Sequence, residues 1–212
     1  MKEAIVDMKL IRSRIIRNAS LLCMGLMSLP VSASVSSDII ANEEPDAAKI
    51  DIARRIIAGL QHDLEDYAAK GSGPFVAAVY DEKGNLVAKM PNTVVIDKCS
   101  HNHAEMNAIK AAEEKLGSHD LTPFNMKLYV TAEPCSMCLG GIIWSGIKEV
   151  YYGVPSDSVE KITGFDEGYK PGWLEAFKKR GIIVYGNIER ELGEKALRDY
   201  VAKGRVIYQP KR

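Results

Sequence analysis

Three side chains with the chemistry of zinc ligands lie in two short segments of the sequence. His103 is followed by Glu105, and Cys135 and Cys138 come 32 and 35 residues after the histidine. A zinc ion held by only three protein groups keeps its fourth position for water, which is typical of a catalytic site. Glu105 is placed to move the protons of that water. The spacing therefore predicts one catalytic Zn²⁺ per chain, bound by His103, Cys135 and Cys138.

Two other uses of these residues follow from the sequence. A structural zinc site needs four protein ligands, and Cys99 and His101 are the nearest candidates for the fourth. Cys135 and Cys138 also have the spacing of a redox C-x-x-C pair. Redox chemistry, however, gives no reason for the histidine–glutamate segment. The roles of Cys99 and His101 stay open.

Apolar periodicity and turn residues predict the elements that carry these segments. Both metal-binding segments begin helices, so Cys135 and Cys138 share one helix face, and the helix amino-terminus favours their thiolates. The expected helices span 46–70, 103–116, 135–145, 173–179 and 188–203, and the expected strands span 75–80, 86–90, 126–131, 148–153 and 181–185. This order predicts an α/β fold, a three-layer α/β/α domain with a five-stranded mixed sheet.

The first 33 residues have the pattern of a signal peptide. A basic stretch, which a second start at Met8 would also include, precedes the apolar run Leu21 to Leu29, and small residues follow at Val31 to Ala33. This pattern predicts export to the periplasm or medium; a chain whose first segment is not a signal would be cytoplasmic. The predicted organisation is a signal peptide at 1–33, a linker at 34–45, a zinc domain at 46–187 and a C-terminal helical segment at 188–212.

Composition and charge narrow the class of partner. The chain is 46% hydrophobic and 26% charged, as soluble globular proteins are, and has 28 basic and 28 acidic residues. Without residues 1–33 it keeps 23 basic and 26 acidic residues, a net charge of −3. A mildly acidic protein is poorly suited to bind nucleic-acid phosphates. The mature form is expected to have no membrane anchor, because the apolar run is too short to span a bilayer.

The spacing H-x-E…P-C-x-x-C is typical of zinc deaminases that act on nucleobases. Here it is completed by Pro134, and its densest part runs from Thr131 to Trp144 as T-A-E-P-C-S-M-C-L-G-G-I-I-W. The chain resembles the cytidine-deaminase-like superfamily, and within it the bacterial guanine deaminases, from about Ile50 to at least Lys170. The resemblance implies a zinc-dependent hydrolase that binds a small purine.

The same resemblance implies further site residues. Asn92 matches an asparagine that hydrogen-bonds the base; a turn residue after Pro91 is the alternative. Trp144 matches a tryptophan near the base pocket, although an apolar helix position could be core. Phe75 matches the phenylalanine of the G-P-F that opens the first strand. Glu167 matches the second acid of a G-F-D-D loop that carries protons to the leaving ammonia, but is one methylene longer.

The resemblance also bears on assembly and on the pocket rim. It implies a homodimer in which the C-terminal segment is swapped onto a neighbouring subunit and covers its active site. An amphipathic helix packed on its own sheet is the alternative for 188–212. The family usually has Asp-Pro-Thr-Ala before H-A-E, whereas this chain has Cys99 to Asn102 there, so the pocket rim is altered.

The function expected from these observations is the hydrolytic deamination of guanine to xanthine and ammonia, with Glu105 and Glu167 as catalytic residues. Deamination of a nucleoside such as guanosine or cytidine needs only a roomier pocket. Deamination of tRNA adenosine fits the motif but not the acidic charge. A zinc-binding module without catalysis is the remaining alternative, and it leaves Glu105 without a purpose.

Overall fold

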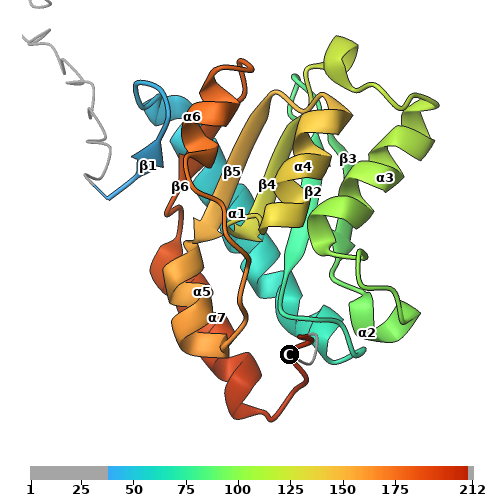
Figure 1. The fold of residues 1–212 in the computed structure, drawn as a ribbon, viewed down its shortest axis with the longest axis vertical. Coiled ribbons are helices and arrows are strands. Elements are labelled where there is room, and N and C mark those ends of the chain that lie inside the picture. Colours follow the sequence, from blue (N-terminus) through green and yellow to red (C-terminus); the bar gives the residue numbers. More distant parts are fainter. Residues whose placement is uncertain (1–37, 210–212) are drawn as a thin grey trace, which may run out of the picture. The chain divides into compact units, whose positions relative to one another are not determined.

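A computed structural model describes residues 38–209 (Figure 1). Its centre is one sheet with the strand order β1-β6-β5-β4-β2-β3. The strands are β1 Ile40–Ala41, β2 Val76–Tyr80, β3 Leu86–Pro91, β4 Lys127–Ala132, β5 Glu149–Val154 and β6 Ile183–Gly186. β4, β5 and β6 are parallel, and the other neighbours are antiparallel, so the sheet is mixed as predicted.

Helices cover both faces of this sheet (Figure 1). They are α1 Ala47–Ala68, α2 Val94–Asp97, α3 Ala104–Leu116, α4 Ser136–Ser145, α5 Ser156–Thr163, α6 Trp173–Lys178 and α7 Arg190–Ala202. Buried residues of α3, α4 and α6 pack on one face, and those of α1 and α7 pack on the other. The three-layer α/β/α architecture is thus confirmed. Among residues 38–209, no helix combines the length and apolarity needed to cross a membrane.

Alternating side chains of the strands supply two separate cores. In β2, Ala77 and Val79 belong to the core under α3 and α4, whereas Val76 and Ala78 belong to the core under α1. This division follows from the two-residue period of a strand. Both faces are apolar because both are covered by helices, which explains why the strand sequences read as nearly continuous hydrophobic runs.

The sheet has one strand more than the sequence predicts. Ile40 and Ala41, in the segment expected to be a linker, form β1 and pair with Gly186 and Tyr185 of β6. A strand of two residues is too short to show a period, so the sequence pattern could not reveal it. α5 was also missed, because only Ser158 and Val159 of its residues are buried and the segment lacks an apolar stripe.

The topology brings several loops to one edge of the sheet. β4 and β5 are parallel, so the residues that follow them, Glu133 and Pro155, leave at the same edge. β2 runs antiparallel to β4, so its first residues begin there, next to the end of β3. Loops beyond the carboxyl ends of parallel strands are the usual place for a site in such sheets. The predicted metal ligands lie in these loops and at the helix starts that follow.

Candidate active site

The three predicted metal ligands meet at one point. The Nδ1 atom of His103 lies 3.4 Å from Sγ of Cys135 and 3.6 Å from Sγ of Cys138, and the two sulfurs are 3.5 Å apart. The three atoms form the one group of histidine, cysteine and acidic side chains among residues 38–209 that could hold a metal ion. Two sulfurs and one nitrogen are the ligand set of catalytic zinc sites that keep a position for water.

The starts of two helices place these ligands. His103 is the N-cap residue of α3 and Cys135 is the N-cap residue of α4. Cys138 lies in the first turn of α4 and is fully buried. The free N–H groups at a helix start favour negative charge, so α4 supports the thiolates that zinc requires. The local fold therefore presents a converging set of ligands without any distortion of the backbone.

The two thiols and Glu105 form a coupled, buried group. Hydrogen bonding from Cys138 and contact with His103 lower the pKa of Cys135 to about 4, whereas donation to Cys135 and burial raise the pKa of Cys138. Glu105 is buried in the first turn of α3. Burial, and then the charge of the Cys135 thiolate, raise the pKa of Glu105 to about 7. A carboxyl group with such a pKa can both accept and donate a proton near neutral pH.

Neither alternative use of the ligands is supported by this arrangement. Cys99 is directed to its own neighbour, because its Sγ lies 2.9 Å from Nδ1 of His101, and neither residue belongs to the group that converges on His103. Cys135 and Cys138 are free thiols. The residues present therefore fit a zinc ion with three protein ligands.

A small cavity beside His103 is lined by residues from several loops: Gly73, Pro74, Phe75, Asn92, Val95, His103, Phe165, Val206, Ile207 and Tyr208. The ring centroid of Phe165 lies 6.2 Å from that of His103 and 5.9 Å from that of Phe75. The free volume is only about 10 Å³, which is barely enough for one water molecule.

Residues after α7 close this cavity. Val206, Ile207 and Tyr208 line it. The residues before them contact other parts of their own chain. The hydroxyl of Tyr200 donates to the carbonyl oxygens of Ser72 at 3.0 Å and Val206 at 2.9 Å. α7 itself packs against α1, α5 and β5 of its own chain. The exchange of this segment between subunits stays a prediction.

The structure brings two of the predicted base contacts together and leaves one apart. Phe75 and Asn92 both line the cavity. Asn92 is buried, and its Oδ1 accepts a hydrogen bond from the backbone N–H of Val94, so it also serves as a turn residue. Trp144 does not line the cavity; its side chain is 87% exposed near the end of α4. Its match to a base-binding tryptophan is therefore not reflected in the arrangement of this single chain.

Glu167 lies beside the metal segment but does not line the cavity. Its carboxylate accepts hydrogen bonds from Ser156 and from Nζ of Lys170, and its carbonyl oxygen accepts one from the N–H of Ser136. Burial raises the pKa of Glu167, against the opposing effect of Lys170. Sequence patterns did not identify Lys170 or Phe165 as site residues, although both lie within three residues of the predicted acid.

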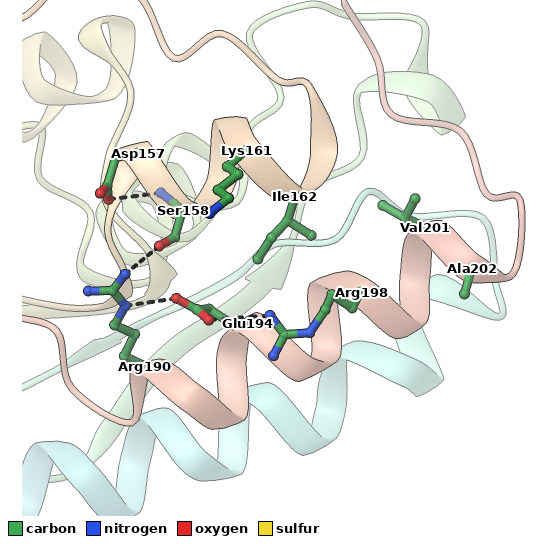
Figure 2. A pocket seen from close by; sticks show the side chains of 9 residues that line it. All are labelled: Asp157, Ser158, Lys161, Ile162, Arg190, Glu194, Arg198, Val201 and Ala202. Atoms are coloured by element: carbon green, nitrogen blue, oxygen red, sulfur yellow. Dashed lines mark hydrogen bonds and ion pairs between the residues drawn. The ribbon is translucent and has the colours of Figure 1, made fainter.

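A larger cavity, about 590 Å³, lies between α5 and α7 (Figure 2). The guanidinium groups of Arg190 and Arg198, which line it, contact other residues of the same cavity. Arg190 donates to Glu194 and Ser158, and Arg198 also contacts Glu194, as the dashed lines in Figure 2 show. None of its lining residues is a thiol or an imidazole. The residues that could hold a metal ion thus lie at His103 rather than in this larger cavity.

Comparison with known proteins places the site in a family. Residues 58–154 match the model of the cytidine and deoxycytidylate deaminase zinc-binding region, and this range contains the three ligands and Glu105. The guanine deaminase of Bacillus subtilis (strain 168) is 37% identical over 98 residues, which are 46% of this chain and 60% of that enzyme. The chain therefore spans less than two thirds of the length of this curated relative.

Two solved structures cover more of the chain. The structure of NE0047 in complex with 2,6-diaminopurine has a TM-score of 0.69 and 37% identity, over 74% of this chain and 85% of that one. The guanine deaminase from Nitrosomonas europaea has a TM-score of 0.68 and 33% identity, over 79% of this chain and 99% of that one. The similarity thus extends well beyond the metal-binding motif.

The relatives also correct one prediction. Export through a signal peptide was expected, but the guanine deaminases that this chain resembles give no support to it. The predicted signal, residues 1–33, lies outside the described residues. A basic and then apolar start is a compositional pattern that other amino-terminal segments share, so the prediction of export was wrong.

Proposed function

The chain belongs to the zinc-dependent deaminases that share the cytidine and deoxycytidylate deaminase zinc-binding region, and from this membership we propose that its substrate is a purine base, guanine, hydrolysed to xanthine and ammonia. The observation that carries the proposal is the convergence of His103, Cys135 and Cys138 beside the buried Glu105. The relatives that act on guanine or bind a purine analogue support the choice of base.

The metal ligands and Glu105 have separate roles in this reaction. Zn²⁺, when bound by the three ligands, lowers the pKa of a water molecule from 15.7 to about 7 and so supplies a nucleophile at neutral pH. Glu105 would accept one proton of that water and pass it to the ring nitrogen, and it would then carry the proton of the new hydroxyl group on the ring carbon to the departing amine, so that guanine and water become xanthine and ammonia. Glu105 is buried in the first turn of α3, close to the ligand His103, and is therefore placed for both transfers.

The cavity walls support the binding of a flat aromatic base. Phe75 and Phe165 offer apolar rings in the cavity wall, with their centroids 5.9 Å apart, and Phe165 lies next to the imidazole of His103. Asn92 offers a side-chain amide at the same wall, which could hydrogen-bond the polar edge of a purine. A purine is far larger than the free volume of about 10 Å³, so the segment Val206–Tyr208 must move before the base can enter.

A second proton carrier is part of the proposal. Glu167 is buried and its pKa is raised, as in many groups that transfer protons. Its carboxylate is held by Ser156 and Lys170, so it would serve the leaving ammonia after a small change of contacts. Replacing Glu167 with Gln should lower kcat while leaving the zinc content unchanged.

We further propose that the enzyme is a homodimer. The indole of Trp144 is 87% exposed, and exposed tryptophans are enriched at the energetic centres of interfaces. Trp144→Ala should weaken dimerisation by about tenfold or more in sedimentation equilibrium. Leu86→Ala, which removes a side chain 45% exposed on β3, should leave the equilibrium unchanged. A wild-type chain that sediments as a monomer at all concentrations would contradict this assembly.

An ammonia-release assay on the zinc-loaded chain tests the proposed reaction. The panel should contain guanine, guanosine, cytosine, cytidine, adenosine and a tRNA with adenosine in its anticodon, and Glu105→Gln is the control for contaminating activity. Release from guanine alone supports the proposal. Release from a nucleoside or tRNA but not from guanine would correct the substrate, and no release from any compound would leave a zinc-binding module.

A further inference from the structure

We propose that Lys170 is a positioning residue of this site, whose ammonium group ties the loop that carries Phe165 to the turn that presents Cys135. The inference rests on the proposed function for its effect on the base, but its effect on the metal ligands can be tested without any substrate.

The ammonium group of Lys170 contacts acceptors from two different segments. Its Nζ lies 2.9 Å from a carboxylate oxygen of Glu133, 2.9 Å from one of Glu167 and 2.8 Å from the carbonyl oxygen of Pro134. The contacts with Glu167 and Pro134 are hydrogen bonds, and the contact with Glu133 is an ion pair. The side chain of Lys170 is only 10% exposed, which is rare for a lysine unless it is paired.

Two of these acceptors directly precede a metal ligand. Glu133 and Pro134 form the turn between the end of β4 and Cys135. The other carboxylate oxygen of Glu133 accepts a hydrogen bond from the N–H of Ser156 at 3.1 Å, which fixes the turn against the start of α5. The contact between Lys170 and Pro134 therefore acts on the residue next to a zinc-binding sulfur.

The third acceptor lies in a loop without regular structure. Residues 164–170 form neither helix nor strand, and this loop passes close to the start of α4. A Cβ atom added to Gly168 would lie 2.5 Å from Oγ of Ser136, and the φ of +81° at Gly168 also favours glycine. The glycine therefore allows the loop to approach α4 closely, and Lys170 follows it two residues later.

Phe165 depends on this anchoring. Its ring forms the cavity wall next to His103 and Phe75. No other aromatic ring of the loop lines the cavity, since Tyr169 is not among the lining residues and is 90% exposed. A shift of the loop would therefore move the wall that faces the base.

The charges show why the ammonium cannot be removed without such a shift. The carboxylates of Glu133 and Glu167, whose side chains are 10% and 5% exposed, share the one positive charge of Lys170. Without it the like charges repel, so one carboxylate must take up a proton or move towards water. Glu167 lies in the irregular loop, so it is the group that can move.

The test compares Lys170→Met with Lys49→Met. Lys49 pairs with Glu149 at 3.0 Å at the opposite edge of the sheet and is 31% exposed, so it controls for the loss of an ion pair. In Lys170→Met we expect the KM for guanine to rise about tenfold or more, with a smaller fall in kcat, because displaced pocket walls cost up to about 100-fold per ångström. Zinc should transfer to a chelator about tenfold faster, as for other residues that support ligands. Lys49→Met should change neither quantity.

Lys170→Arg and a double variant separate position from charge. Arginine keeps the charge, but its planar fork cannot reproduce three converging contacts, so its KM should lie between those of wild type and Lys170→Met. If Lys170→Met does not fold, Lys170→Met/Glu133→Gln removes the repulsion and should fold with the KM and zinc defects retained.

Two results would overturn the inference. One is a lower melting temperature in Lys170→Met, or in the double variant, with unchanged KM and zinc release; Lys170 would then only stabilise the fold. The other is full recovery of KM in Lys170→Arg. If the wild type acts on no base, the proposed function fails, while the comparison of zinc release still tests the link between Lys170 and Cys135.

Discussion

Arg205 donates hydrogen bonds to both carboxylate oxygens of Glu65, at 2.7 and 3.0 Å, and so joins the segment after α7 to α1. Lys203 contacts the same carboxylate at 2.8 Å. The residues that follow, Val206–Tyr208, close the cavity beside His103. We call the segment Val206–Tyr208 the cover of the cavity. The contacts among Glu65, Lys203 and Arg205 therefore attach the cover to α1.

Acid should weaken the ion pairs of Glu65 with Arg205 and Lys203 in a definite pH range. Hydrogen bonds from Arg205, and then from Lys203, lower the pKa of Glu65 from 4.5 to about 2. A carboxyl group with a lower pKa in the folded state adds stability above its unfolded pKa and loses it as the pH falls towards the folded value. The melting temperatures of wild type and Glu65→Gln should differ most above pH 5 and converge between about pH 4.5 and 2. A constant difference across this range would contradict the assignment, and Glu160→Gln, an exposed change on α5, is the control.

Removing the cover should expose the metal. A chain that ends at Gly204 lacks the three residues that close the cavity, so a chelator should take zinc from it several-fold faster than from the full chain, because small molecules reach a site only through its open side. The control ends at Gln209 and keeps all lining residues. Equal rates for the two truncated chains would show that Val206–Tyr208 do not limit access.

Glu105→Gln should separate metal binding from proton transfer. The amide keeps the size of the side chain but cannot carry a proton, so kcat should fall about 10²- to 10⁴-fold. Zinc content, measured by atomic absorption, should stay at that of wild type, since Glu105 is not among the three converging ligands. Glu114→Gln, at an exposed position of the same helix, should retain full activity. Loss of zinc in Glu105→Gln would mean that the carboxylate is needed to hold the metal.

Replacing one ligand should remove both zinc and activity. Cys138→Ser substitutes a poor zinc ligand for a buried thiolate, so the protein should be purified without stoichiometric zinc and should melt at a lower temperature than the wild type. Cys99→Ser should keep its zinc, because Cys99 contacts His101 rather than the ligand group. If Cys99→Ser loses zinc instead, the site has a fourth protein ligand and is structural.

The sequence predicted the layers of the fold and the metal ligands because both leave local patterns. His103, Cys135 and Cys138 are identified by residue type and spacing, and their helices by apolar periodicity. The structure confirms that these elements meet at one edge of a mixed sheet. Phe75 and Asn92, inferred from family resemblance, also line the cavity.

The remaining features depend on contacts between distant segments. The pairing of Lys170 with Glu133 joins residues that no periodicity relates, and β1 pairs with a strand more than 140 residues away. Trp144 was expected near the base pocket, or alternatively in the core, but it is exposed, because its place on the helix face is set by packing with neighbours rather than by its own type. Single-chain patterns could not reveal any of these.

One ion is bound by residues at the starts of both α3 and α4. The stability of the fold therefore depends on the free concentration of zinc. An ion that binds the folded chain and not the unfolded one shifts the balance by mass action, adding about 2.7 kcal/mol when its free concentration is about 100 times its dissociation constant. Cells or buffers depleted of zinc should therefore hold a chain that unfolds sooner and is degraded faster, long before any shortage of substrate is felt.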